Sequence, residues 1–313
     1  MHPSTLVIGE ALIDIVRGTD GSVREHVGGS PFNTAIGLGR LGHPVSLATY
    51  IGDDAYGLAI SDALSVDGVD LTPGSVTAPA TPTARATLDE TGAATYDFDL
   101  AWAPRTPLPG SRGHLHTGSI ATALQPGASA VRDAVVAHRA QGTISLDPNP
   151  RPTIIGEAAS VRSGIEELVG LSDVVKASDE DIAWLYGEDA DLGEVLRLWG
   201  QLGPSLVVAT RGGDGALVHL SGTGELVDVP GRRVALVDTV GAGDSFMSGM
   251  LSWLLDEDLL GAADARDRLR VAPREALLAA VDRGVATSAV TVSRAGSQPP
   301  TRAELGLPGA GSD

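Results

Sequence analysis

Short apolar runs with the composition of β-strands alternate with helical patterns along most of the 313-residue chain. The runs predict buried strands at residues 5–9, 45–51, 143–146, 173–176, 206–210 and 234–237. The helical patterns cover residues 31–41, 56–66, 128–141, 160–171, 179–186, 192–202, 245–255 and 273–288. Such alternation is typical of an α/β fold with a mainly parallel central sheet and helices on both faces. Ligands of such folds bind at the carboxyl ends of the strands.

Two predicted hairpins break this alternation. One joins residues 13–16 to 23–27, and the other joins residues 84–88 to 94–98. Their four strands can form a small β-sheet, which would be either a lid over a binding site or a cover for the core. We favour a lid, formed from about residues 12–28 and 83–103. The reason is that the first hairpin lies between Asp14 and the glycine pair Gly28-Gly29.

Composition and charge exclude several classes of function. The formal net charge is −18 and the sequence pI is about 4.6, which argues against binding to nucleic acid or an anionic membrane, because both need basic surface. No apolar run approaches the ~18 residues of a membrane span, and the N-terminus lacks a signal-peptide pattern. The absence of cysteine excludes disulfides and fits a cytoplasmic location. With Lys176 as its single lysine, the chain has no Walker-A phosphate loop.

The segment Asp238-Thr-Val-Gly-Ala-Gly-Asp-Ser-Phe246 carries the strongest functional signal. A predicted strand precedes it and a predicted helix follows it, which places the small residues 241–243 at a strand-to-helix turn. Main-chain amides can converge on one anion at such a turn, and the helix dipole adds positive potential. Asp244 stands at the helix start. It either caps the helix or takes a proton while the amides hold a transferring phosphoryl group.

Two glycine-rich motifs lie at the first predicted helix. Gly28-Gly29-Ser-Pro-Phe-Asn33 is either an ordinary loop or a place where a ligand approaches the main chain. In the second case Asn33 would offer a donor and an acceptor to a hydroxyl-rich molecule. Gly37-Leu-Gly39-Arg-Leu-Gly42 matches the dinucleotide pattern G-x-G-x-x-G, but it lies in a helix rather than after a strand. We therefore expect these glycines to allow close helix packing and to end the helix.

Three further motifs lie at the carboxyl ends of predicted strands. Asp147-Pro-Asn-Pro-Arg151 is either a proline-rich turn or a site for a polar ligand, with Arg151 as a phosphate contact. Ser178-Asp-Glu-Asp181 has the spacing of a helix capping box, and Asp181 could also face Mg²⁺ through water. Thr210-Arg-Gly-Gly-Asp-Gly215 could be a hairpin turn, a contact to nucleotide phosphate, or both.

Taken together, these motifs resemble the PfkB (ribokinase-like) carbohydrate kinases, from Gly9 to about Pro299. Residues 238–246 resemble the most specific signature of that family, and Gly28-Gly29 with Asn33 resembles its second one. The resemblance implies one ribokinase-like α/β kinase domain over residues 1–300, followed by a loosely ordered tail at residues 301–313. It also implies phosphoryl transfer from ATP, with Mg²⁺, to a sugar hydroxyl, and K⁺ as an activator in many members.

The resemblance also implies roles for individual residues. Asp244 would be the general base, and the amides of Gly241, Ala242, Gly243 and Asp244 would form an anion hole. The acceptor sugar would be bound by Asp14, Gly28, Gly29, Asn33, Arg151 and Asp244. The nucleotide would be bound by Lys176, Thr210, Gly212, Gly215, Gly243, Ala286 and Ala289. Mg²⁺ would be held through water by Asp181, and a monovalent cation by Asp238, Val240, Thr291, Arg294 and Gly296.

Several details look like fructokinases, which convert fructose to fructose 6-phosphate. They include Gly9-Glu10 followed by Asp14, and Asp147-x-Asn-x-Arg151. The acidic sugar ligand that ribokinases carry near position 118 is replaced by Gly118-Ser119, which argues against ribose. In addition, the Asn-x-x-Glu motif of the family becomes Ser178-x-x-Asp181, which puts its metal role in doubt.

Other activities found within this family also fit the sequence. The alternatives are a 2-keto-3-deoxygluconate kinase, a kinase for a nucleoside or another ketose, and an inactive sugar-binding member. An acid sugar would need a cation at the acceptor end, so Arg85 or Arg105 would have to point inward. Lid sheets of this family can pair between subunits, so a homodimer formed through the lid is also compatible with the resemblance.

Overall fold

The computed structural model describes residues 4–88, 94–110 and 113–309. Nine strands within these ranges form the central sheet, in the order β15-β14-β13-β12-β11-β10-β1-β4-β6. They are β1 (Thr5–Ile8), β4 (Val45–Ala48), β6 (Val69–Leu71), β10 (His114–Gly118), β11 (Thr143–Asp147), β12 (Val174–Ser178), β13 (Leu206–Thr210), β14 (Ala216–Leu220) and β15 (Glu225–Val229). Neighbouring strands are parallel except in the pairs β13–β14 and β14–β15. The predicted mainly parallel sheet is therefore confirmed.

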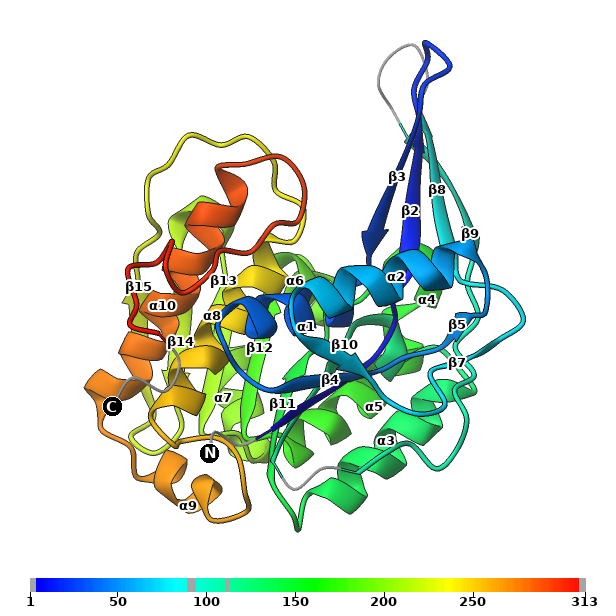
Figure 1. The fold of residues 1–313 in the computed structure, drawn as a ribbon. Coiled ribbons are helices and arrows are strands. Elements are labelled where there is room, and N and C mark those ends of the chain that lie inside the picture. The colour runs from blue at the N-terminus through cyan, green and yellow to red at the C-terminus, as the bar shows by residue number, and fades with distance from the viewer. Residues whose placement is uncertain (1–3, 89–93, 111–112, 310–313) are drawn as a thin grey trace.

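Helices cover both faces of this sheet (Figure 1). One face carries α1 (Ser30–Arg40), α2 (Ala55–Val66), α8 (Ala242–Asp256), α9 (Ala265–Arg270) and α10 (Arg274–Val292). The other carries α3 (Gly127–His138), α5 (Ala158–Leu171), α6 (Asp179–Tyr186) and α7 (Leu192–Leu202). The short α4 (Pro152–Ile155) follows β11. None of the described helices is long and apolar enough to cross a membrane.

Alternation of side chains along the strands supplies both cores. Successive residues of a strand face opposite sides of a sheet. In β1, Val7 packs into the core under α1, α8 and α10, whereas Leu6 and Ile8 pack into the core under α3, α5 and α7. Such continuous apolar runs are expected where a parallel sheet is buried on both faces.

Close helix packing explains the glycines of α1. A Cβ atom on Gly37 would lie 2.3 Å from Ser248 Oγ of α8, and one on Gly39 would lie 2.4 Å from the Asp67 carbonyl oxygen. Gly42, with φ of +81°, follows the end of the helix. The G-x-G-x-x-G pattern at residues 37–42 therefore serves helix packing and termination, as predicted.

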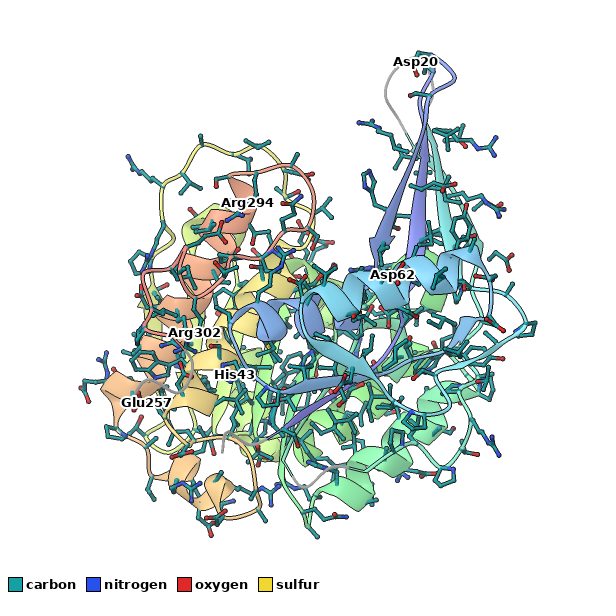
Figure 2. The ribbon with its side chains drawn as sticks, in the orientation of Figure 1. Asp20, His43, Asp62, Glu257, Arg294 and Arg302 are labelled. Carbon is teal, nitrogen blue, oxygen red and sulfur yellow. The ribbon has the colours of Figure 1, made fainter. Side chains whose placement is uncertain are left out.

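A second, four-stranded sheet projects from the body of the molecule (Figure 1). Its order is β3-β2-β8-β9, formed by β2 (Leu12–Arg17), β3 (Val23–Gly28), β8 (Thr83–Leu88) and β9 (Ala94–Asp99). Both predicted hairpins are present, joined by parallel pairing of β2 with β8. Asp20 lies at its outer end (Figure 2). We call it the lid sheet. A separate small pair joins β5 (Ile51–Gly52) to β7 (Val76–Ala78).

The predicted strand at residues 234–237 is wrong. No strand forms there, and Val234, Leu236 and Val237 are 45, 68 and 60% exposed. A strand needs a neighbour to pair its main-chain groups, and the described part of the chain places none beside this segment. Instead, the amides of Val237 and Asp238 donate to the Val292 carbonyl at the end of α10, at 2.8 and 3.3 Å. The glycine-rich turn therefore follows an irregular segment.

The C-terminal segment at residues 301–309 lies against the body of the protein. The Arg302 guanidinium donates to the Asp256 carboxylate at 3.1 and 3.2 Å and to the Leu41 carbonyl at 3.0 Å (Figure 2). These bonds hold a segment that the sequence predicts to be loosely ordered. Composition alone does not reveal that one arginine, Arg302, reaches the ends of α1 and α8. Residues 310–313 lie outside the described ranges.

Candidate active site

Asp244 lies where the first turns of α1 and α8 meet. Its side chain accepts hydrogen bonds from Ser30 Oγ at 2.6 Å and from Asn33 Nδ2 at 2.8 Å. Both donors belong to the first turn of α1, and the residue is only 7% exposed. Two helix N-termini thus surround one carboxylate, and each adds favourable potential for a negative charge. The carboxylate is oriented by both of its oxygen atoms, as a positioned acid–base group must be.

The amides at the start of α8 are largely free. Gly241, Gly243 and Asp244 donate to no group in the described part of the chain, whereas the Ala242 amide donates to the Thr239 carbonyl at 3.2 Å. Gly241 has φ of +72°, and a Cβ atom there would lie 2.0 Å from Ser297 Oγ. Only glycine suits this turn. Three of the four amides predicted to form an anion hole are therefore available to a ligand.

Lys176, at the end of β12, extends toward these amides. Its Nζ donates to Asp147 Oδ2 at 2.8 Å, and both side chains are buried. A Cβ atom on Gly243 would lie 2.9 Å from Lys176 Nζ, so the ammonium borders the predicted anion hole. Burial opposes its charge, but Asp147 and Asp181 outweigh burial and raise the pKa of Lys176 above its usual value. The single lysine is therefore a permanent positive charge at this place.

The predicted acceptor-binding residues also come together. A Cβ atom on Gly28 would lie 2.2 Å from Asp14 Oδ2, so the glycine makes room for that carboxylate. Gly29 precedes α1 with φ of +110°, and Asn33 lies one turn later beside Asp244. Burial raises the pKa of Asp14, and the charges of His26 and Arg151 oppose this rise. Arg151 is thus on the same side of the site.

The predicted nucleotide residues lie at the neighbouring strand ends. Thr210 Oγ1 donates to the Ala177 carbonyl at 3.4 Å, which places the end of β13 beside the end of β12. The turn that follows is closed by a bond of 2.8 Å from the Arg211 amide to the Gly215 carbonyl, with positive φ at Gly212 and Gly215. The hairpin interpretation of residues 210–215 is confirmed. Ala286 and Ala289 lie on α10, which packs against β14 and β15.

The residues predicted to hold a monovalent cation form one cluster. The Asp238 carboxylate accepts from the Val240 amide at 3.0 Å and from the Gly296 amide at 2.9 Å. These two bonds lower the pKa of Asp238. The Arg294 amide donates to the Thr291 carbonyl at 3.2 Å, so the turn after α10 is closed against the Asp238 segment.

Asp181 forms the predicted capping box. Its amide donates to Ser178 Oγ at 3.0 Å, and its Oδ2 accepts from the Ser178 amide at 2.8 Å. Within residues 4–88, 94–110 and 113–309, no group of three or more His, Cys, Asp or Glu side chains could hold a metal ion. Mg²⁺ that arrives with nucleotide phosphates needs only one or two carboxylates. Asp181 and the neighbouring Asp147, whose Oδ1 is buried and unpartnered, fit this need.

Ser30 is a site residue that the sequence patterns did not indicate. It stands at the first position of α1 and precedes a proline, so a pattern would assign it to the helix start. Its partner Asp244 is 214 positions away. The Ser30 hydroxyl can be recognised as a site group only when the packing of α1 on α8 is already known.

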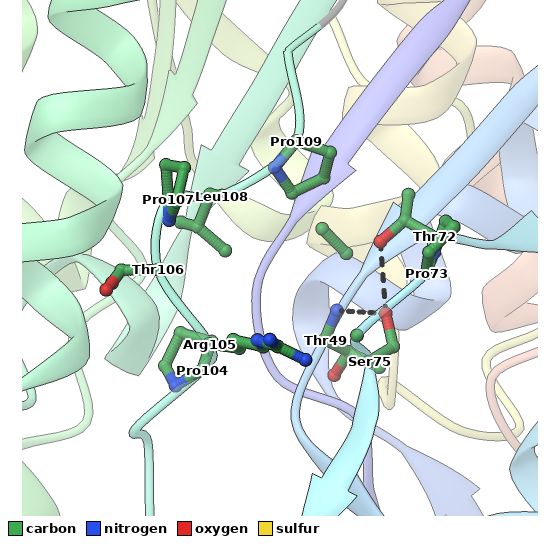
Figure 3. Close-up of a pocket in the computed structure, with 12 residues that line it drawn as sticks. Thr49, Thr72, Pro73, Ser75, Pro104, Arg105, Thr106, Pro107, Leu108 and Pro109 are labelled. Carbon is green, nitrogen blue, oxygen red and sulfur yellow. Dashed lines mark hydrogen bonds between the residues drawn. The ribbon is translucent and has the colours of Figure 1, made fainter.

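A cavity of about 430 Å³ lies at the end of β4, lined by residues 48–49, 72–75 and 104–109. Figure 3 shows Arg105 pointing into it toward Thr49 and Ser75. None of the predicted acceptor-binding residues lines this cavity. Arg85 pairs with Asp97 on the lid sheet at 3.7 Å. Among the described residues, neither arginine forms a hydrogen bond or ion pair with a residue predicted to bind the acceptor.

Comparison with known proteins agrees with this geometry. The model of the pfkB family carbohydrate kinases matches residues 3–304. A fructokinase of Rhizobium leguminosarum bv. trifolii is 36% identical over 82% of this chain and 81% of its own length, and one of Klebsiella pneumoniae is 32% identical over 81% and 85%. A Vibrio cholerae O395 fructokinase double mutant, solved with fructose, ADP and potassium, has a TM-score of 0.80 at 26% identity, covering 97% and 98%. The chain therefore belongs to the pfkB family of carbohydrate kinases.

Proposed function

We propose that this protein transfers the γ-phosphoryl group of ATP to O6 of fructose, which yields fructose 6-phosphate and ADP. The observation that carries the proposal is the meeting of Asp244 with free amides at the start of α8, beside Asp14, Gly29 and Asn33. Fructokinases are the relatives that share about a third of its residues over most of the chain.

Each group of the site has a chemical part in this reaction. The Asp244 carboxylate takes the proton of the attacking hydroxyl as the new O–P bond forms and the bond to the ADP oxygen breaks. The free amides of Gly241 and Gly243 and the Lys176 ammonium hold the negative charge of the transferring group. Mg²⁺ would be held near Asp181 and Asp147, where it would neutralise nucleotide phosphate charge.

We also infer that the Asp238 cluster binds K⁺. The ionised carboxylate orders two main-chain segments at the entrance to α8, and the Vibrio cholerae neighbour was solved with potassium. A bound cation there would fix the turn that presents the Gly241 amide. Activity measured with K⁺ and with tetramethylammonium at equal ionic strength checks this role.

An acceptor panel tests the proposed function. Purified protein with ATP and Mg²⁺ should release ADP fastest with fructose, when compared with other ketoses, aldoses, 2-keto-3-deoxygluconate and nucleosides. The product should be accepted by glucose-6-phosphate isomerase, which distinguishes the 6-phosphate from the 1-phosphate. Faster turnover of another acceptor would contradict fructose, and sugar binding without ADP release would point to an inactive member.

We propose that the lid sheet closes over the acceptor. Asp14 lies on β2, Gly28 ends β3 and Gly29 follows it, so a bound sugar would touch the base of this sheet. Fructose should therefore slow amide hydrogen exchange in residues 13–27 and 84–98, while exchange in α7 stays unchanged. Equal exchange with and without fructose would rule the lid out. The outer strands β3 and β9 have no further neighbour in the described residues, so pairing with a second copy remains compatible.

A further inference from the structure

Glu10 is a buried carboxylic acid on the acceptor side of the site. It lies two residues after the end of β1 and is 6% exposed. Ser119, which follows β10, acts on its carboxyl group and lowers its pKa. The second carboxyl oxygen, Oε2, is buried and has no hydrogen-bond partner among the described residues. Buried polar groups of folded proteins are nearly always paired, so this oxygen is an exception that needs a physical reason.

The surroundings of Glu10 are those of the predicted acceptor site. A Cβ atom on Gly29 would lie 2.5 Å from the Glu10 carbonyl oxygen, so the glycine pair packs directly against this residue. The charges of Arg151 and Asp244 both act on the Glu10 carboxyl group. Glu10 thus lies within electrostatic range of both the proposed general base and the arginine on the acceptor side.

The partner Ser119 is held in an uncommon backbone conformation. Its φ is +55°, in the left-handed region that residues other than glycine rarely adopt. Such conformations persist where the surroundings fix them, and they gather at binding sites. The pairing of β1 with β10 brings Glu10 and Ser119 side by side at the carboxyl edge of the sheet. The ends of β1 and β10 therefore place Ser119, in this conformation, beside the Glu10 carboxyl group.

Burial raises the pKa of Glu10 to about 7. Ser119 and Arg151 oppose this rise, whereas the charge of Asp244 adds to it. Near neutral pH the group therefore exists both as an acid and as a carboxylate. A sugar hydroxyl can accept a hydrogen bond from the first form and donate one to the second.

We propose that Glu10 is a further acceptor-binding residue, whose unpartnered oxygen hydrogen-bonds one hydroxyl of the sugar and so helps to select the acceptor. The inference rests on the proposed sugar kinase activity, but it does not require that the sugar is fructose.

The test compares Glu10→Ala and Glu10→Gln across fructose and its single deoxy analogues. Glu10→Ala should raise the KM for fructose about 10- to 100-fold, the usual effect of losing a hydrogen bond to a charged group. The KM for ATP should stay unchanged, and Glu10→Gln should lose less. The loss should disappear for the one analogue that lacks the contacted hydroxyl. Glu257→Ala, at the exposed far end of α8, controls for the chemical change.

A structural role gives a different result. If Glu10 only supports the fold, both variants should show the same relative loss with every acceptor, together with a lower Tm, and this pattern would overturn the proposal. Failure of the wild-type protein to release ADP with any sugar would instead contradict the proposed function. Calorimetry then measures the Kd of the same sugars for the wild type and for Glu10→Ala, which gives the same comparison without turnover.

Discussion

Replacement of Asp244 by asparagine should lower kcat by at least about 100-fold, because a positioned base supplies a rate factor of about 10²–10⁴. Asparagine keeps the shape of the side chain and an oxygen that can accept from Ser30. It cannot take the proton of the attacking hydroxyl. The KM values for fructose and ATP should change little, since neither substrate depends on proton transfer for binding. Steady-state measurement of ADP release checks both parameters.

Asp267→Asn is the matched control for this change. Asp267 also lies in the first turn of a helix, α9, but it is exposed on the surface. The control should keep wild-type turnover, and the two variants should have similar circular dichroism spectra. Turnover by Asp244→Asn close to that of the wild type would remove Asp244 from the reaction, and with it the main argument for this site.

Capping residues close to each helix explain why the first and last residues of several helices could be predicted from the sequence. Residues 179–186 and 192–202 coincide with α6 and α7, because Ser178 and Asp191 cap the two helices with their side chains. The hairpins of the lid sheet could be predicted equally well, since short turns and alternating runs are visible within about fifteen residues. The site could then be placed at the carboxyl edge of the sheet, because ligands of such folds bind there.

Contacts between segments that are distant in the sequence could not be predicted from these local patterns. The run at residues 234–237 has the composition of a strand, yet whether it pairs depends on which neighbour the sheet offers, and none of the described residues offers one. The bond from Ser30 to Asp244 depends on how α1 crosses α8. The Ala242 amide was expected to be free, but the turn at Thr239 uses it. Each of these features is decided by tertiary packing.

Ambiguity of residue type is a second limit. Ser178 with Asp181 satisfied both a capping and a metal-binding interpretation, and the structure confirms the capping bonds while the metal role stays a proposal. A carboxylate that caps a helix through one oxygen can still face a cation through the other. Sequence spacing alone does not separate these two uses.

Lys176→Met should lower kcat about 10²- to 10³-fold, the usual cost of removing one group that stabilises transition-state charge. Methionine fills a similar volume without a charge. The KM for ATP should also rise, because the ammonium borders the predicted phosphate site at Gly243. Steady-state kinetics with varied ATP measures both effects.

Stability must be separated from catalysis in this variant. Removing one partner of a buried ion pair leaves the other charge unpaired, which costs about 3–5 kcal/mol, so Lys176→Met should also lower the Tm. The double variant Lys176→Met with Asp147→Asn removes both charges of the pair and should recover part of the Tm. Its kcat, measured at saturating Mg²⁺ because Asp147 is also a proposed magnesium ligand, should nevertheless stay low, since no ammonium faces the transferring group. Recovery of kcat together with the Tm would show that Lys176 only supports the fold, and that the amides of α8 hold the phosphoryl group without it.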